Sequence, residues 1–204
     1  MKIVVDPGHG GIDAGAKWKE KYGCREENDL NLSISYYLKY ELDLLNHKVT
    51  LSRYNDIYVG LKERTLLADK FDADIFISIH ADAWHNTNED GISTHKYGSG
   101  ERTKLLANII HSQLTHKFPD HTNRGIKSSE FYVLQNTRMP SVLIKCGPIT
   151  YPKEKKFFNA VINQVLLAKA IASGVKSYIK STYREDALQR TIYRWVWHNW
   201  LHRF

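Results

Sequence analysis

Two histidines follow directly on apolar runs that are typical of buried strands. His9 lies in the glycine-rich segment Asp6–Gly11, immediately after Ile3-Val4-Val5, and His80 ends the run that begins at Ile75. In α/β proteins, functional side chains lie at the carboxyl ends of the strands. Two imidazoles that leave neighbouring strand ends, with a carboxylate between them, are ligands that zinc prefers. The pattern therefore predicts a metal site on an α/β scaffold.

Glu27 is the candidate for the third ligand. It stands at the entrance to a predicted helix, where its backbone is fixed while its side chain still faces the loops. A hydrolytic zinc site needs three protein ligands and one open position for water, whose pKa the metal lowers to about 7. Each residue alone is more often structural than ligating. Together, His9, Glu27 and His80 predict a bound Zn²⁺ ion.

The elements that must position these residues alternate along the chain. Apolar runs predict strands at residues 2–5, 48–52, 75–79, 91–97, 131–134 and 142–144. Helical spacing of apolar residues predicts helices over residues 30–45, 61–71, 105–114 and 154–178. This alternation predicts an α/β fold with a mostly parallel twisted sheet and helices on both faces. The zinc site is then expected at the carboxyl ends of the strands.

Composition is that of one ordinary folded domain. The 204 residues are 42% hydrophobic and 25% charged, and Lys and Arg exceed Asp and Glu by seven (29 against 22). Excess positive charge favours anionic partners such as nucleic acid, phospholipid or bacterial wall polymers. No nucleic-acid-binding motif is recognised, so no nucleic-acid partner is expected. Cys24 and Cys146 lack a CxxC spacing and are predicted to be reduced, partly buried thiols.

The beginning of the sequence lacks the basic and apolar regions of a signal peptide, and no apolar run approaches the roughly 20 residues that span a bilayer. We therefore expect a protein made in the cytoplasm that reaches its site of action by other means.

The composition changes after Lys180. Trp195, Trp197 and Trp200, three of the five tryptophans, fall within the last ten residues, together with two histidines and one arginine. We expect a domain over residues 1–180 and a basic, Trp-rich helical extension over residues 181–204. Such a helix suits an anionic wall polymer or membrane, contacted through Tyr193–Phe204. Formation of a homodimer and packing back onto its own domain are the alternatives.

Short motifs extend the pattern from Lys2 to about Tyr178. They are Asp6–Gly11 with Asp13 and Gly15, Glu27 with Asn31 and Leu32, Arg53 with Asp56, Leu61 and Arg64, Ser78–Asp82, Arg124 with Gly125, and Met139–Ile144. Their order and spacing resemble the zinc-dependent N-acetylmuramoyl-L-alanine amidases of bacterial wall-remodelling enzymes and phage endolysins. The resemblance implies zinc bound by His9, Glu27 and His80. It also implies bacterial peptidoglycan as the substrate.

The reaction implied by the resemblance is hydrolysis of the amide between the lactyl group of muramic acid and L-alanine of the stem peptide. The family acts on bacterial wall during phage lysis, germination or cell separation. The missing signal peptide fits a phage lysin, or an enzyme freed when the cell lyses.

One position departs from the family pattern. The family ends the strand equivalent to residues 142–144 in a glutamate that acts as general base, whereas Lys145 stands there in this chain. A charged ammonium cannot take a proton from water, and it would repel a divalent ion. Lys145 must then be neutral, turn away or weaken zinc binding. We therefore predict an amidase whose activity is impaired.

Two other functions remain open. A catalytically inactive wall-binding or regulatory module could keep the amidase fold without its base. A zinc carboxypeptidase or aminopeptidase on a related scaffold would release free amino acids instead of whole stem peptides. Zinc content and identification of the released product separate these alternatives.

The remaining polar candidates have less specific signals. Arg124, in a predicted polar loop, could bind stem-peptide carboxylates through its guanidinium. Arg53, Asp56 and Arg64 are predicted equally as structural ion-pair residues or substrate contacts. The histidines predicted to lie at the surface are His85, His95, His111, His116 and His121.

Overall fold

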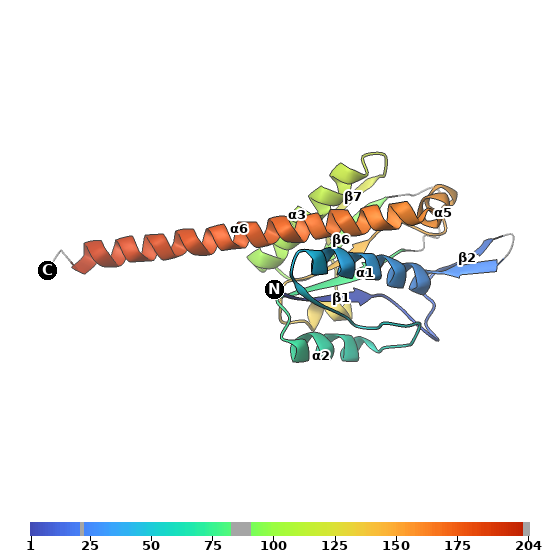
Figure 1. The fold of residues 1–204 in the computed structure, drawn as a ribbon, viewed down its shortest axis with the longest axis horizontal. Helices are drawn as coiled ribbons and strands as arrows, with labels where there is room; N and C mark the ends of the chain where they lie inside the picture. Colours follow the sequence, from blue (N-terminus) through green and yellow to red (C-terminus); the bar gives the residue numbers. More distant parts are fainter. Residues whose placement is uncertain (21–22, 83–90, 202–204) are drawn as a thin grey trace.

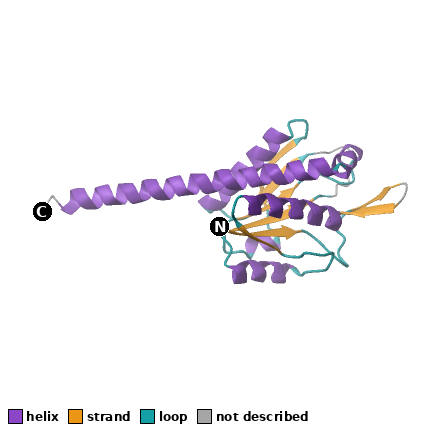
Figure 2. Ribbon diagram, viewed as in Figure 1, coloured by secondary structure: helices purple, strands orange, loops and turns teal. Residues whose placement is uncertain are grey.

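A single sheet organises the fold of the protein in the computed structural model (Figures 1 and 2). The structure describes residues 1–20, 23–82 and 91–201, without the side chains of residues 18–20, 23–25, 152 and 185–201. The six strands, in their spatial order, are β4 (Lys48–Leu51), β1 (Lys2–Pro7), β5 (Ile75–His80), β8 (Ser141–Lys145), β6 (Ile92–Lys96) and β7 (Asn123–Ser128). Adjacent strands are parallel except β6 and β8, which pair antiparallel. The predicted mostly parallel sheet is confirmed.

Helices cover both faces of this sheet, as predicted. The buried apolar residues form two clusters, one between the sheet and helices α1, α3 and α6 and the other between the sheet and helices α2 and α4. In Figure 1, α2 lies on the opposite side of the sheet from α1 and α6. The bounds of the helices are α1 (Glu27–Leu44), α2 (Leu61–Phe71), α3 (Glu101–Lys117), α4 (Tyr132–Gln135), α5 (Pro152–Asn159) and α6 (Val161–Leu201). A separate antiparallel hairpin, β2 (Lys17–Glu20) and β3 (Gly23–Glu26), leads into α1 and was not predicted.

The central strands are apolar on both faces because helices bury both. In β1, Ile3 and Val5 belong to the cluster beneath α1, α3 and α6, whereas Val4 belongs to the cluster beneath α2 and α4. In β5, Ile77 belongs to the cluster beneath α1, α3 and α6, and Phe76 belongs to the cluster beneath α2 and α4. Continuous apolar runs are typical of parallel strands buried on both faces. The runs identified in the sequence are therefore the strands whose ends carry the candidate ligands.

Two predicted elements are wrong. Residues 131–134 form no strand, because the chain turns into the short helix α4 there, and Val133 and Leu134 are both buried. A short apolar run has no periodicity that distinguishes a strand from a buried helical turn. The single helix predicted over residues 154–178 is two helices, since Ala160 adopts an extended conformation between α5 and α6. Arg124, predicted in a loop, lies in β7.

Helix α6 continues well beyond the sheet, and its second half projects away from the rest of the domain (Figure 1). The boundary predicted near residue 180 falls inside this helix. Among the described residues, no single helix is long and apolar enough to span a bilayer, although α5 and the first part of α6 reach that composition as a pair bent by 86°.

Candidate metal centre

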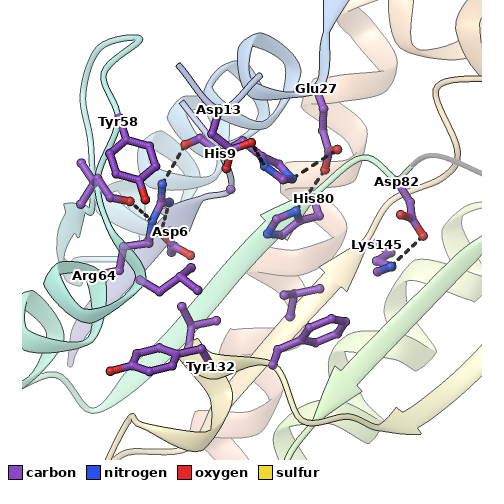
Figure 3. Close-up of a pocket in the computed structure, with 16 residues that line it drawn as sticks. Asp6, His9, Asp13, Glu27, Tyr58, Arg64, His80, Asp82, Tyr132 and Lys145 are labelled. Atoms are coloured by element: carbon purple, nitrogen blue, oxygen red, sulfur yellow. Dashed lines mark hydrogen bonds and ion pairs between the residues drawn. The ribbon is translucent and has the colours of Figure 1, made fainter. Parts of the chain in front are cut away.

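Three side chains predicted as metal ligands meet at one edge of the sheet (Figure 3). His9 follows β1, Glu27 is the first residue of α1, and His80 is the last residue of β5. One potential ligand atom from each lies within 4.8 Å of the other two. Two imidazoles and a carboxylate at these separations are suited to a divalent transition metal. The tertiary structure thus brings together residues that are up to 71 positions apart in the sequence.

Direct contacts connect the three candidates. His80 Nδ1 lies 3.0 Å from Glu27 Oε1, and His9 Nε2 lies 3.4 Å from Glu27 Oε2. Burial alone would raise the pKa of Glu27, but hydrogen bonds and charge interactions with His80 and His9 outweigh burial and lower that pKa. Burial would lower the pKa of His9, whereas contacts with Glu27 and Asp13 produce a net increase. Glu27 is therefore a carboxylate at neutral pH, the form that binds a metal.

Outer hydrogen bonds hold the candidates in place. Asp13 Oδ1 lies 2.9 Å from His9 Nδ1, on the ring nitrogen remote from Glu27. The backbone N–H of Ala16 donates to Glu27 Oε2 at 3.0 Å. Asn31 accepts a bond from the backbone of Ala81 at 2.8 Å, next to His80. Carboxylate partners of this kind orient a histidine ligand and increase its basicity.

The turn that carries His9 needs a residue without a side chain at Gly15. Gly15 has a φ of 65°, and a Cβ atom there would lie 2.7 Å from Glu27 Oε2. Any larger residue would therefore combine backbone strain with a clash against the cluster. The glycines next to His9 serve other close approaches, since a Cβ at Gly8 would clash with the His80 ring and one at Gly10 or Gly11 with the backbone of residues 57–58.

Two buried arginines support the strand end beneath the cluster. Arg53 donates to the carbonyl oxygens of Pro7 and Gly8 at 3.1 and 3.0 Å. Arg64 donates to the carboxylate of Asp6 and to the carbonyl of Pro7, both at 2.7 Å. Burial would raise the pKa of Asp6, but the charge of Arg64 and hydrogen bonds lower it. These contacts favour the structural alternative for both arginines.

Asp56 also contacts protein groups. Its carboxylate accepts hydrogen bonds from the backbone N–H of Gly11 at 2.7 Å and from the Asn28 side chain at 2.8 Å. It ties the glycine-rich turn to the first turn of α1. This arrangement favours a structural role for Asp56 as well.

Lys145 lies beside the cluster. It is the register partner of His80 across β5 and β8. Its Nζ atom lies 2.8 Å from Asp82 Oδ2 and 5.6 Å from the centre of the Phe131 ring. The ammonium therefore contacts a carboxylate, as Figure 3 shows, and also an aromatic ring.

The cluster opens into a cavity of about 410 Å³. Tyr58 and Tyr132 line it on one side of His80, and Asp82 and Lys145 line it on the other (Figure 3). Sequence reasoning did not assign a site role to Tyr58, Tyr132 or Asp82. A signal existed for Asp82 only, since it follows His80 by two residues in the motif Ser78–Asp82. Among the described residues, Arg124 does not line this cavity. Its role in substrate binding stays a prediction.

Two histidines predicted at the surface are buried. His95 and His111 are each 6% exposed. The ring of His95 lies between two serine hydroxyls at 2.7 and 3.1 Å, and that of His111 between threonine and asparagine side chains at 3.1 and 2.8 Å. These polar neighbours satisfy the rings inside the fold. Except for Ser93, which lies in β6 together with His95, they come from other parts of the chain that local sequence does not reveal.

The other predictions for single residues have mixed outcomes. His116 is exposed, as predicted, whereas the His121 side chain is largely buried and its Nδ1 atom lies 2.9 Å from Glu154 Oε1. His85 lies outside the described residues. Cys146 is a buried free thiol, and burial raises its pKa to about 12. The side chain of Cys24 is outside the described part of the structure.

The fold and the cluster define a class of α/β domains that gather a two-histidine, one-glutamate metal-binding set at the carboxyl edge of a mostly parallel sheet. Residues 3–177 match the model of the N-acetylmuramoyl-L-alanine amidase family. The chain therefore belongs to this family, and the predicted resemblance is confirmed.

Individual relatives agree with this assignment. A Staphylococcus epidermidis protein named "Probable cell wall amidase LytH" is 34% identical over 179 residues, which cover 88% of this chain and 58% of the relative. The chain thus spans less than two thirds of the length of that relative. The structure of an N-acetylmuramoyl-L-alanine amidase from Clostridium difficile 630 is 36% identical, with a TM-score of 0.83 over 88% of this chain and 97% of the other.

A second solved structure covers the same part of the fold. The catalytic domain of CwlV, an N-acetylmuramoyl-L-alanine amidase from Bacillus (Paenibacillus) polymyxa, is 29% identical. Its TM-score is 0.81, over 88% of this chain and 98% of that domain. The similarity covers nearly a whole catalytic domain of another protein.

Proposed function

We propose that this chain is a peptidoglycan hydrolase that cleaves the amide between N-acetylmuramic acid and L-alanine. The observation that carries the proposal is the meeting of His9, Glu27 and His80 beside an open cavity. Family membership supports the same reaction. The matched proteins are named as amidases, which favours an enzyme over a non-catalytic wall-binding module.

We propose Zn²⁺ as the resident metal, held by His9, Glu27 and His80. The donor set fits, because two imidazole nitrogens and one carboxylate oxygen are typical of hydrolytic zinc sites that leave a position for water. When bound, zinc would supply a water of lowered pKa and polarise the scissile carbonyl. Asp13 fixes the ring orientation of His9, and the backbone of Ala16 fixes the carboxylate of Glu27.

We propose that turnover is limited by Lys145. A general base accelerates proton transfer by about 10²–10⁴-fold, and an ammonium in an ion pair with Asp82 has no free electron pair to accept a proton. The chain is therefore expected to retain metal binding and substrate binding, while hydrolysis is slow.

Zinc analysis coupled to product identification tests this function. The purified full chain is analysed for metal and then incubated with purified peptidoglycan, with His80→Ala as the metal-site control. An amidase releases whole stem peptides that begin with a free L-alanine amino group, and the control releases none. Free amino acids as the main product would identify the carboxypeptidase or aminopeptidase alternative and overturn the proposal.

The cell wall is the proposed place of action, since the substrate is located there. The phage-lysis setting, or release of the protein when a cell lyses, stays a prediction. Nucleic acid is not among the proposed partners.

We further propose that residues 181–204 contact an anionic wall polymer or membrane. Residues 187–204 contain three arginines and no acidic residue, so a second copy would place like charges together. This charge pattern favours an anionic surface over a homodimer. Deletion of residues 181–204 should abolish liposome or wall binding without changing the oligomeric state measured by sedimentation. A dimer of the full chain that becomes a monomer on deletion would instead indicate the homodimer.

A further inference from the structure

We propose that Asp82 is a positioning residue that holds the Lys145 ammonium away from Glu27 and so keeps Glu27 available for the metal. This inference rests on the proposed zinc site. It explains how the chain can keep a cation next to a site for a second cation. Glu27, Asp82 and Lys145 all line the same cavity.

Lys145 is placed within reach of the cluster. It is paired in register with His80 on the neighbouring parallel strand, and neighbouring strands lie about 4.8 Å apart. His80 in turn contacts Glu27 at 3.0 Å. Lysine carries its ammonium on a flexible four-carbon side chain, so the Lys145 ammonium can reach from β8 towards the Glu27 carboxylate. An ion pair there would compete directly with a metal for a ligand.

Asp82 supplies the alternative partner. Its Oδ2 atom lies 2.8 Å from Lys145 Nζ, and the two side chains are only 20% and 23% exposed. Partial burial reduces screening by water, which strengthens the attraction between them. The Phe131 ring lies 5.6 Å from the same Nζ atom and adds a cation–π contact. The ammonium therefore has two partners other than Glu27, and its ion pair with Asp82 is drawn in Figure 3.

The backbone fixes Asp82 relative to Lys145. The N–H of Asp82 donates to the carbonyl of Gly147 at 3.1 Å, and the N–H of Ile149 donates to the carbonyl of Asp82 at 2.8 Å. The N–H of Cys146 also donates to the carbonyl of His80 at 2.8 Å. These bonds clamp the segment after β5 to the segment after β8. These backbone hydrogen bonds hold the two residues of the ion pair at a fixed separation.

Zinc affinity in a double-mutant cycle tests the inference. Dissociation constants are measured by competition with a chromophoric chelator for the parent chain, Asp82→Asn, Lys145→Met and the double variant. Asp82→Asn should weaken zinc binding about 10-fold or more, because the released Lys145 ammonium would compete with the metal for the Glu27 carboxylate. With Lys145→Met in place, the same change should weaken binding by no more than about 3-fold, because no ammonium is present to compete.

Two further measurements separate the possible outcomes. Asp82→Glu retains the charge and should restore most of the affinity, and circular dichroism spectra show whether each variant is folded. An equal loss of affinity from Asp82→Asn with and without Lys145 would overturn the inference and leave the zinc site intact. Absence of zinc binding by the folded parent chain would instead contradict the proposed function itself.

Discussion

The two sides of the cavity differ in how charge is stabilised: the cluster side holds Glu27, and the lysine side holds Lys145. On the cluster side, the negative charge of Glu27 is stabilised by contacts with His9 and His80 and by the backbone N–H of Ala16. On the lysine side, Lys145 is stabilised by Asp82. The first side has the donor set proposed to bind a metal, whereas the second carries the lysine that is proposed to limit turnover. If both proposals hold, substitutions on the first side should change metal affinity and substitutions on the second should change turnover.

The largest effect is expected from a substitution that supplies a carboxylate at position 145. Lys145→Glu should increase the rate of stem-peptide release from purified peptidoglycan by about 10²–10⁴-fold. Lys145→Gln is the matched control, because it removes the positive charge without supplying a base. Equal rates for the parent and Lys145→Glu would show that the base lies elsewhere and would remove the contrast between the two sides.

The support beneath the cluster should be essential for stability. Arg64→Met leaves the buried Asp6 carboxylate without its charge partner, and breaking a buried pair costs about 3–5 kcal/mol of the free energy of unfolding. Arg138→Met removes an ion pair with Asp69 at 3.5 Å, in which Arg138 is 87% exposed, and should cost at most about 1 kcal/mol. Urea denaturation measures both. Similar losses from the two variants would contradict the structural role assigned to Arg64.

Removal of the carboxylate ligand tests the cluster side directly. Glu27→Gln should raise the zinc dissociation constant by roughly 10²-fold, since a structural zinc site gains roughly 3 kcal/mol per ligand. The exposed Glu130→Gln is the control and should leave zinc affinity unchanged. The measurement is chelator competition at fixed pH. Unchanged affinity in Glu27→Gln would place the metal elsewhere.

The smallest effect is a pH dependence on the lysine side. Burial, followed by the charges of Lys145 and Lys127, lowers the pKa of His95 to about 4, against about 6.5 in an unfolded chain. As the pH falls below about 6.5, the unfolded state takes up this proton first, so the stability contributed by neutral His95 is present above that pH and is lost towards pH 4. His95→Gln should therefore reduce the slope of unfolding free energy against pH in this window. An unchanged slope would show that His95 does not titrate differently in the two states.

Much of the scaffold and of the candidate site follows from local sequence. The apolar runs before His9 and His80 identify strands, and their carboxyl ends meet because parallel strands share an edge. Glu27 is found through its place at the start of a helix. These features depend on periodicity and chain order, which are visible in one sequence. Lys145 is recognised as a departure only through the resemblance to the amidase family, whose pattern has a glutamate at that position.

Contacts between distant segments could be decided only by the tertiary structure. The short apolar run at residues 131–134 fits a strand or a helix equally, and packing beneath the sheet selects the helix α4. His95 is buried because hydroxyl groups from two other positions satisfy its ring. The partner of Lys145 likewise depends on how the segments after β5 and β8 are clamped together. Sequence determined which chemical groups reach the edge of the sheet, and three-dimensional packing determined which charges neutralise one another, because electrostatic attraction depends on distance in space.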